Sequence, residues 1–122
     1  MILGIGTDII EIDRIQKAIE KNSNFLNKVF TESEIKMFKS KNMRYEVIAG
    51  NFAGKEAVSK ALGTGIRGFS LKDIEILRDD LGKPVVIIKD NIKKIIGIEH
   101  RISISISHNK KDAVSFVILE AI

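Results

Sequence analysis

The sequence predicts an α+β domain in which an antiparallel sheet packs against one long central helix and shorter helices. Three patterns favour this class: an alternating strand at residues 2–10, a proline-free helical run at residues 45–62, and a second alternating strand at residues 102–107. Because 122 residues fit one compact unit, residues 1–122 are interpreted as a single domain.

The first strand, residues 2–10, places Gly4, Gly6 and Asp8 on one face. Because glycines leave open space, we expect Asp8 to meet a ligand there without a neighbouring side chain in the way. Two alternatives stand beside this reading. The glycines are also typical of a strand packed closely against a helix, and Asp8 is also explained by a salt bridge or a helix N-cap.

Helices are predicted next, beginning with residues 11–21, which carry an isoleucine stripe. Another side of this helix presents a basic ridge of Arg14, Lys17 and Lys21. Thr31 and Glu34 have the spacing of a capping box, so a further helix is expected to start there.

The longest helix, residues 45–62, is expected to end at Gly63, which suits a C-terminal cap. Glu56 and Lys60 lie one turn apart on the same face of this helix. The simplest explanation of that spacing is an ordinary exposed ion pair.

The pattern in the second half of the chain predicts mainly strands. The expected elements are strands at 74–77 and 85–88, a short helix at 91–98, and strands at 102–107 and 113–119. His108 stands at the exit of the fourth strand and precedes Lys110 and Lys111. It is interpreted either as a solvated turn histidine or as a cationic contact to phosphate.

Composition narrows the function classes. The absence of cysteine excludes disulfides and thiolate sites. The apolar start is interrupted by Asp8 and Glu11 and lacks a basic region, so neither a signal peptide nor a membrane span is expected and a cytoplasmic location is predicted. A net charge of +4 favours an anionic partner.

Two rival functions follow from the charge and the size. An RNA-binding module normally displays aromatic residues on a strand face, whereas aromatic content here is 6% and the serine-isoleucine strand offers no stacking platform. We therefore expect no nucleic acid partner. An oligomeric scaffold is the second rival, and it leaves Asp8 and Glu56 without a shared purpose.

Carboxylates on different elements suit a hard cation such as Mg²⁺, which takes few protein ligands and completes its shell with water and phosphate. Asp8 and Glu56 are the candidate ligands, and Lys60 could hold a phosphate oxygen. The backbone of residues 63–65 could approach a nucleotide closely. Together these residues favour a phosphoryl-transfer site without establishing it.

Blocks of sequence then resemble a known family. The matching blocks are Gly-Thr-Asp-Ile-Ile-Glu-Ile-x-Arg-Ile at 6–15, Phe-Thr-x-x-Glu at 30–34, Phe-Ala-Gly-Lys-Glu-Ala-x-x-Lys-Ala-x-Gly-Thr-Gly at 52–65, Leu-Gly-Lys-Pro at 81–84 and Ser-Ile-Ser-His at 105–108. In this order they resemble the holo-acyl-carrier-protein synthases, the small bacterial type of 4′-phosphopantetheinyl transferase. The resemblance spans nearly the whole chain.

The resemblance implies an enzyme of the phosphopantetheinyl transferase fold. It would transfer phosphopantetheine from coenzyme A to a serine of apo-acyl carrier protein, release adenosine 3′,5′-bisphosphate and support fatty acid biosynthesis. Asp8 and Glu56 resemble the ligands of Mg²⁺, for which Mn²⁺ is an alternative, and Lys60 resembles the pyrophosphate-binding lysine. The residues that resemble the nucleotide pocket are Gly63, Thr64, Gly65, Lys83, Pro84 and His108.

The resemblance also implies partners. The ridge of Arg14, Lys17 and Lys21 is similar to the surface that docks the acidic carrier protein. A homotrimer with active sites at the subunit interfaces is implied as well. Glu56 and a metal-bound water both stay candidates for accepting the serine proton.

Three positions depart from the family pattern. Asn51 replaces a frequent arginine, which puts one phosphate contact in doubt. Gly54 stands where alanine is common, at a cost of about 1 kcal/mol in helix propensity. Asp112 occupies a position where tyrosine is frequent.

Overall fold

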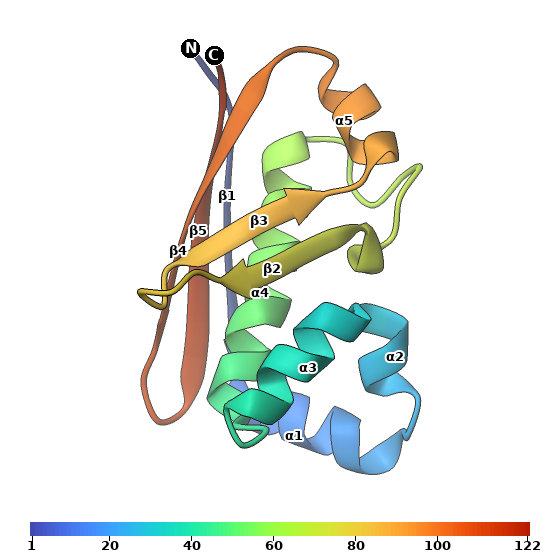
Figure 1. The fold of residues 1–122 in the computed structure, drawn as a ribbon, viewed down its shortest axis with the longest axis vertical. Helices are drawn as coiled ribbons and strands as arrows, with labels where there is room; N and C mark the ends of the chain where they lie inside the picture. The colour runs from blue at the N-terminus through green and yellow to red at the C-terminus, as the bar shows by residue number, and fades with distance from the viewer.

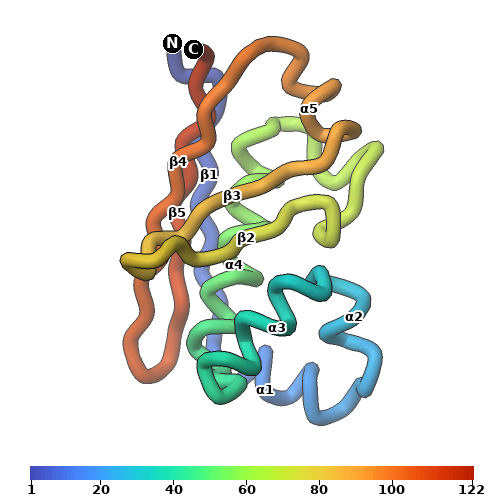
Figure 2. Tube along the Cα trace, viewed as in Figure 1, coloured from blue at the N-terminus to red at the C-terminus, as the bar shows by residue number.

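The computed structural model describes residues 1–122, arranged as two antiparallel sheets with one long helix between them (Figure 1). The elements in chain order are β1 (Ile2–Glu11), α1 (Ile12–Lys21), α2 (Phe25–Val29), α3 (Glu32–Ser40), α4 (Tyr45–Leu62), the 3-10 turn η1 (Leu71–Asp73), β2 (Ile74–Arg78), β3 (Pro84–Ile88), α5 (Asp90–Ile96), β4 (His100–His108) and β5 (Asp112–Ala121). The Cα trace shows β1 and β5 side by side, with both termini at the same end of the molecule (Figure 2). The predicted α+β class is confirmed.

The larger sheet has the strand order β1-β5-β4, and both pairings are antiparallel. Asp8 lies opposite Ser115 of β5, and Ser115 lies opposite Ile106 of β4. These residues therefore belong to one row across the sheet. The β1 edge and the β4 edge are separated by the width of the central strand.

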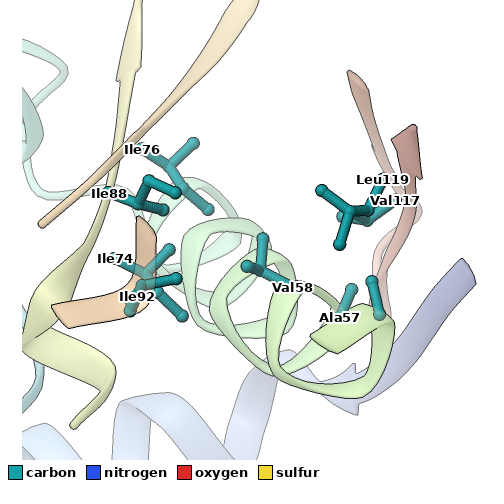
Figure 3. Packing of buried hydrophobic residues seen from close by; sticks show 9 residues of the cluster. Ala57, Val58, Ile74, Ile76, Ile88, Ile92, Val117 and Leu119 are labelled. Carbon is teal, nitrogen blue, oxygen red and sulfur yellow. The ribbon is translucent and has the colours of Figure 1, made fainter. Parts of the chain in front are cut away.

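Helix α4 begins at Tyr45 and ends at Leu62, as the sequence predicts, and Gly63 caps it with a φ of 76°. The β2–β3 hairpin crosses α4 on the side away from the larger sheet (Figure 1). Val58 of α4 lies between the hairpin isoleucines and the Val117 and Leu119 side chains of β5 (Figure 3). One apolar core thus joins both sheets through α4.

Strand β1 approaches α4 unusually closely at two glycines. A Cβ atom on Gly4 would lie 1.9 Å from the Ala61 carbonyl oxygen, and one on Gly6 would lie 1.8 Å from that of Ala57. The expectation of open space at these glycines is therefore wrong, because helix backbone fills it. The alternative of close strand–helix packing is confirmed.

Helices α1, α2 and α3 form a second layer over the lower part of α4 (Figure 1). Phe30 and Phe38 are fully buried there and pack edge to face. The predicted capping box is present, since the Thr31 hydroxyl accepts from the Glu34 amide and the Glu34 carboxylate accepts from the Thr31 amide.

Several bounds differ from the sequence prediction. Glu11 ends β1 instead of starting α1, and α5 ends at Ile96. Helix α2 has five residues, too few for a periodic pattern, and was not predicted. No helix of the chain combines the length and apolar composition needed to cross a membrane.

Candidate active site

The Asp8 carboxylate on β1 and the Lys60 ammonium on α4 form one side of the candidate site. Lys60 Nζ lies 3.2 Å from Asp8 Oδ1 and 2.9 Å from the Thr7 carbonyl oxygen. The Asp8 side chain is 17% exposed and that of Lys60 is 56% exposed. Asp8 thus sits at the base of the site, with the lysine reaching over it from solvent.

Glu56 contributes a second carboxylate from α4, one turn before Lys60. Burial, and then the negative charge of Asp8, raise the pKa of Glu56, while Lys60 opposes this shift. Asp8 and Glu56 are therefore close enough to interact electrostatically within one protomer. The simple Glu56–Lys60 ion pair does not form, since Lys60 pairs with Asp8 instead.

A surface hollow of about 310 Å³ adjoins these groups. It is lined by Glu56, Ser59, Lys60, Gly63, Gly65 and Ile66. Gly63 and Gly65 both have positive φ and open space where a side chain would stand, so their backbone is accessible to a ligand. Thr64 is exposed between them, with its hydroxyl donating to the Gly65 carbonyl.

Pro84 and His108 lie at a different hollow, of about 230 Å³, along the β4 edge. Three basic residues that the sequence patterns did not single out line the same hollow: Lys41, Arg44 and Arg78. Lys41 and Arg44 flank the short α3–α4 connection, and the fold brings Arg78 of β2 to them. Lys83 is exposed in the β2–β3 turn and does not line this hollow.

The predicted site residues therefore form two groups within one protomer. Asp8 and Lys60 meet at the β1 edge of the sheet, whereas His108 ends the strand at the β4 edge. The structure brings Asp8, Glu56, Lys60 and the residue 63–65 loop together. It places Pro84 and His108 elsewhere.

The basic ridge lies on the exposed side of α1. Arg14, Lys17 and Lys21 are all exposed, and Ile12 and Ile15 bury the opposite side. Lys17 is paired with Asp13 at 2.9 Å, so its charge is partly compensated. Arg14 takes part in no ion pair of the structure.

Asn51 and Gly54 face the interior of the protein. The Asn51 amide nitrogen donates to Glu34 and to the Ile76 carbonyl, so it has no donor left for a ligand. A Cβ on Gly54 would lie 2.5 Å from the Ile76 side chain, which explains the small residue. Asp112 begins β5 and accepts from the Asn109 amide through its carbonyl.

The donor set of the β1–α4 site fits a magnesium-like cation. No group of three or more His, Asp or Glu side chains is positioned to hold a metal ion anywhere in the chain. Mg²⁺ needs only one or two carboxylates when water and phosphate supply the remaining ligands. Burial, and then the negative charge of Asp8, raise the pKa of Glu56, and a dication bound there would offset both by stabilising the ionised carboxylate.

Comparison with known proteins decides the family. The family model described as the 4′-phosphopantetheinyl transferase superfamily matches residues 4–117. The chain belongs to this superfamily. A holo-[acyl-carrier-protein] synthase of Clostridium perfringens (strain 13 / Type A) is 59% identical over 126 residues, covering 98% of this chain and 95% of its relative. One of Clostridium botulinum (strain Alaska E43 / Type E3) is 57% identical over 123 residues and covers both chains fully.

Solved structures agree with this membership. A holo-(acyl-carrier-protein) synthase from Bacillus anthracis, in complex with CoA (3′,5′-ADP), matches with a TM-score of 0.83 and 43% identity, covering 100% of this chain and 99% of that one. The enzyme from Neisseria meningitidis matches with a TM-score of 0.89 and 38% identity, covering 98% and 99%. The predicted family, fold and enzyme class of this transferase are confirmed, and so is phosphopantetheine transfer as its function.

Proposed function

We propose that this transferase moves the 4′-phosphopantetheine group from coenzyme A to a serine of apo-acyl carrier protein at the β1–α4 site, with Mg²⁺ held by Asp8 and Glu56. The products are holo-acyl carrier protein and adenosine 3′,5′-bisphosphate. The observation that carries this proposal is the juxtaposition of Asp8, Glu56 and Lys60 beside an open hollow. A cytoplasmic location and a role in fatty acid biosynthesis are part of the proposal.

Positioning and charge neutralisation are the main tasks in phosphoryl transfer. Asp8 and Glu56 would hold the cation, which when bound offsets negative charge on the diphosphate. Lys60 binds a phosphate oxygen, because its long and half-exposed side chain reaches into the hollow. The backbone of Gly63 and Gly65 lets the nucleotide approach without steric obstruction.

The carrier serine attacks the phosphorus that bears pantetheine. A bond forms between the serine oxygen and this phosphorus, and the bond to the bridging oxygen of the diphosphate breaks. The leaving group departs as adenosine 3′,5′-bisphosphate, whose new charge lies next to Lys60. The serine proton must leave as the new bond forms, which requires a base within hydrogen-bond reach.

We further propose that a complete site forms between two copies of the chain in a homotrimer. Support comes from the two hollows, which lie towards opposite edges of one sheet, so that a single protomer does not join them. The Pro84 and His108 hollow of one copy would complete the nucleotide site of its neighbour. Its lining holds three cations, Lys41, Arg44 and Arg78, against the single acid Glu46, which pairs with Arg44, and this excess of positive charge suits the phosphates of coenzyme A.

The outer face of the larger sheet supplies an apolar surface for this assembly. Ile5 and Ile9 are 56% and 67% exposed, and Phe116 beside them is 45% exposed. Such contiguous exposure is typical of an interface.

The acidic carrier protein would dock on the exposed basic ridge of α1, where charge complementarity mainly raises the association rate.

The direct test is to mix the protein with apo-acyl carrier protein, coenzyme A and Mg²⁺, and to look for the phosphopantetheine adduct by mass spectrometry. We expect the adduct to form and to disappear with EDTA. Asp8→Asn and Glu56→Gln should each lower turnover at least about 100-fold, a loss typical of removing a group that stabilises developing charge. Unchanged circular dichroism would show that the fold is intact.

Asp90→Asn is the matched control, because Asp90 is exposed on α5 and does not line the hollow of the site. It should retain full turnover. Full activity in Asp8→Asn or Glu56→Gln would remove that residue from the site, and an adduct that forms in EDTA would contradict the metal requirement.

A further inference from the structure

The Lys60 ammonium is the only charged partner of the Asp8 carboxylate. No other side chain donates a hydrogen bond to Asp8, and Lys60 completes its own contacts with the Thr7 carbonyl. Glu56, by contrast, forms no ion pair. The site thus holds one cationic group against two carboxylates.

The position of Lys60 conflicts with that of a metal ion. Mg²⁺ coordinates carboxylate oxygen at about 2.0–2.1 Å. An ammonium nitrogen 3.2 Å from Asp8 Oδ1 would lie within a few ångströms of such a dication, at a separation where like charges repel strongly. Both cations therefore compete for the same carboxylate.

We propose that Lys60 occupies the cation position at Asp8 in the metal-free protein and must exchange to a phosphate oxygen when a divalent cation and coenzyme A bind. This inference rests on the proposed metal role of Asp8 and Glu56. The exchange is sterically simple, because Lys60 is more than half exposed and has a flexible four-carbon side chain. The hollow beside it gives the side chain somewhere to go.

The exchange makes metal binding and coenzyme A binding cooperative. A metal that binds alone leaves Lys60 displaced and without an anion, whereas coenzyme A supplies a diphosphate for it. Each ligand therefore raises the affinity for the other, and by linkage the two effects are equal. Direct contact between metal and diphosphate adds to this coupling but does not depend on Lys60.

Mn²⁺ binding to the full-length protein, followed by electron paramagnetic resonance of free Mn²⁺, tests the exchange without any turnover. In the absence of coenzyme A, Lys60→Met should bind Mn²⁺ at least about 5-fold more tightly than the wild type, the lower end of common coupling energies. Added coenzyme A should then raise Mn²⁺ affinity less in Lys60→Met than in the wild type.

Lys89→Met is a closely matched control. The Lys89–Asp73 pair spans 3.5 Å with side-chain exposures of 64% and 18%, compared with 3.2 Å, 56% and 17% for Lys60–Asp8. Removing Lys89 also deletes one positive charge and leaves one aspartate without its ion-pair partner, although Asp73 keeps its hydrogen bonds from the Ser70 amide and the Asn91 side chain. Its Mn²⁺ affinity should stay within about twofold of the wild type, which separates a local exchange from a general effect of net charge.

The possible outcomes separate this inference from the proposed function. Mn²⁺ binding that Asp8→Asn abolishes, but that Lys60→Met leaves unchanged or weakens, would overturn the exchange and keep the metal site. An equal gain in Lys89→Met would overturn it too. Mn²⁺ binding that is absent even with coenzyme A, or is insensitive to Asp8→Asn, would refute the proposed metal site and the exchange with it.

Discussion

The Lys55 ammonium lies against the Glu34 carboxylate with both side chains fully excluded from solvent. Lys55 also donates to the carbonyls of Leu71 and Ile74, and Glu34 accepts from the Ile76 amide. The pair therefore ties α3, α4 and the start of β2 together. Burial lowers the pKa of Lys55 and raises that of Glu34, while each partner opposes the shift of the other.

Breaking this pair from one side should strongly destabilise the fold. Lys55→Met leaves a buried carboxylate without its counter-ion, and Glu34→Gln leaves a buried ammonium, so each should lower the free energy of unfolding by about 3–5 kcal/mol. Urea unfolding at one protein concentration measures the loss. The double variant should lose clearly less than the two losses added together.

Lys93→Met serves as the comparison for this cycle, because Lys93 pairs with Asp90 at 3.9 Å on an exposed helix face. It should change stability by no more than about 0.5 kcal/mol. Strictly additive losses in the Glu34 and Lys55 cycle would show that the two buried groups do not act as a pair.

The raised pKa of Glu56 should make the stability of the metal-free protein depend on pH. The folded protein holds a proton on Glu56 more tightly than the unfolded chain, whose ordinary value is 4.5. Its favourable contribution is complete below that value and is lost as pH rises through the raised pKa. Glutamine cannot ionise and avoids the loss.

Glu56→Gln should therefore gain stability relative to the wild type between about pH 4 and pH 7, measured by urea unfolding in EDTA. Comparing the two pH values cancels any constant effect of the substitution on packing. If the stability difference between variant and wild type is the same at both pH values, the pKa of Glu56 is not raised in the folded protein.

Arg14→Glu should weaken recognition of the carrier protein more than recognition of coenzyme A. Arg14 is exposed on α1 with no acidic partner, so reversing its charge acts fully on an acidic ligand. Steady-state kinetics should show a larger rise in KM for the carrier than for coenzyme A. Lys17→Glu should have a smaller effect, because Asp13 already compensates Lys17.

A high salt concentration should shrink the Arg14→Glu effect, since exposed charges are screened over about 10 Å at 0.1 M salt. Equal rises in the KM values for the carrier and for coenzyme A would argue against docking on α1.

Phe116→Lys should disrupt the proposed homotrimer. Phe116 lies on the outer face of the larger sheet, opposite Thr7 on β1 and Ser105 on β4, and is 45% exposed. A charge there would have to be desolvated in an interface. Light scattering should give a smaller mass for the variant, with activity falling in parallel because each site would lack its second half.

Ser103→Lys, at an exposed position on the β4 side of the same face, tests how far the interface extends. A monomeric mass for the wild type at micromolar concentration would contradict the assembly directly.

Local pattern predicted the elements of this fold well, because their periodicity and caps lie in contiguous residues. Helix α4, its Gly63 cap and the Thr31–Glu34 capping box needed no tertiary information. The sequence did not predict helix α2, because five residues are too few to show a helical period and the packing of Phe25 against Phe30 stabilises it instead. The expected open space at Gly4 and Gly6 was wrong because a helix distant in sequence fills it.

The candidate site was predictable only in part, for the same reason. Asp8 stood out as an acid within an apolar strand, whereas the spacing of Glu56 and Lys60 by itself indicated an ordinary exposed ion pair; the resemblance assigned the roles of both acids. The partner of Lys60 was not predictable, since the i,i+4 spacing indicated Glu56 and the strand supplied Asp8. Lys41, Arg44 and Arg78 carry no shared sequence signal, because the α3–α4 connection supplies the first two and β2 supplies the third.

The contact of Gly4 and Gly6 with α4 determines which substitutions the site can survive. Main-chain atoms of the helix, and not interdigitated side chains, set the spacing between the two elements that carry Asp8 and Glu56. Apolar residues elsewhere in the interior can therefore be exchanged for others of similar volume without altering the distance between the two acids. Sequence drift should leave these glycines in place while the rest of the core varies.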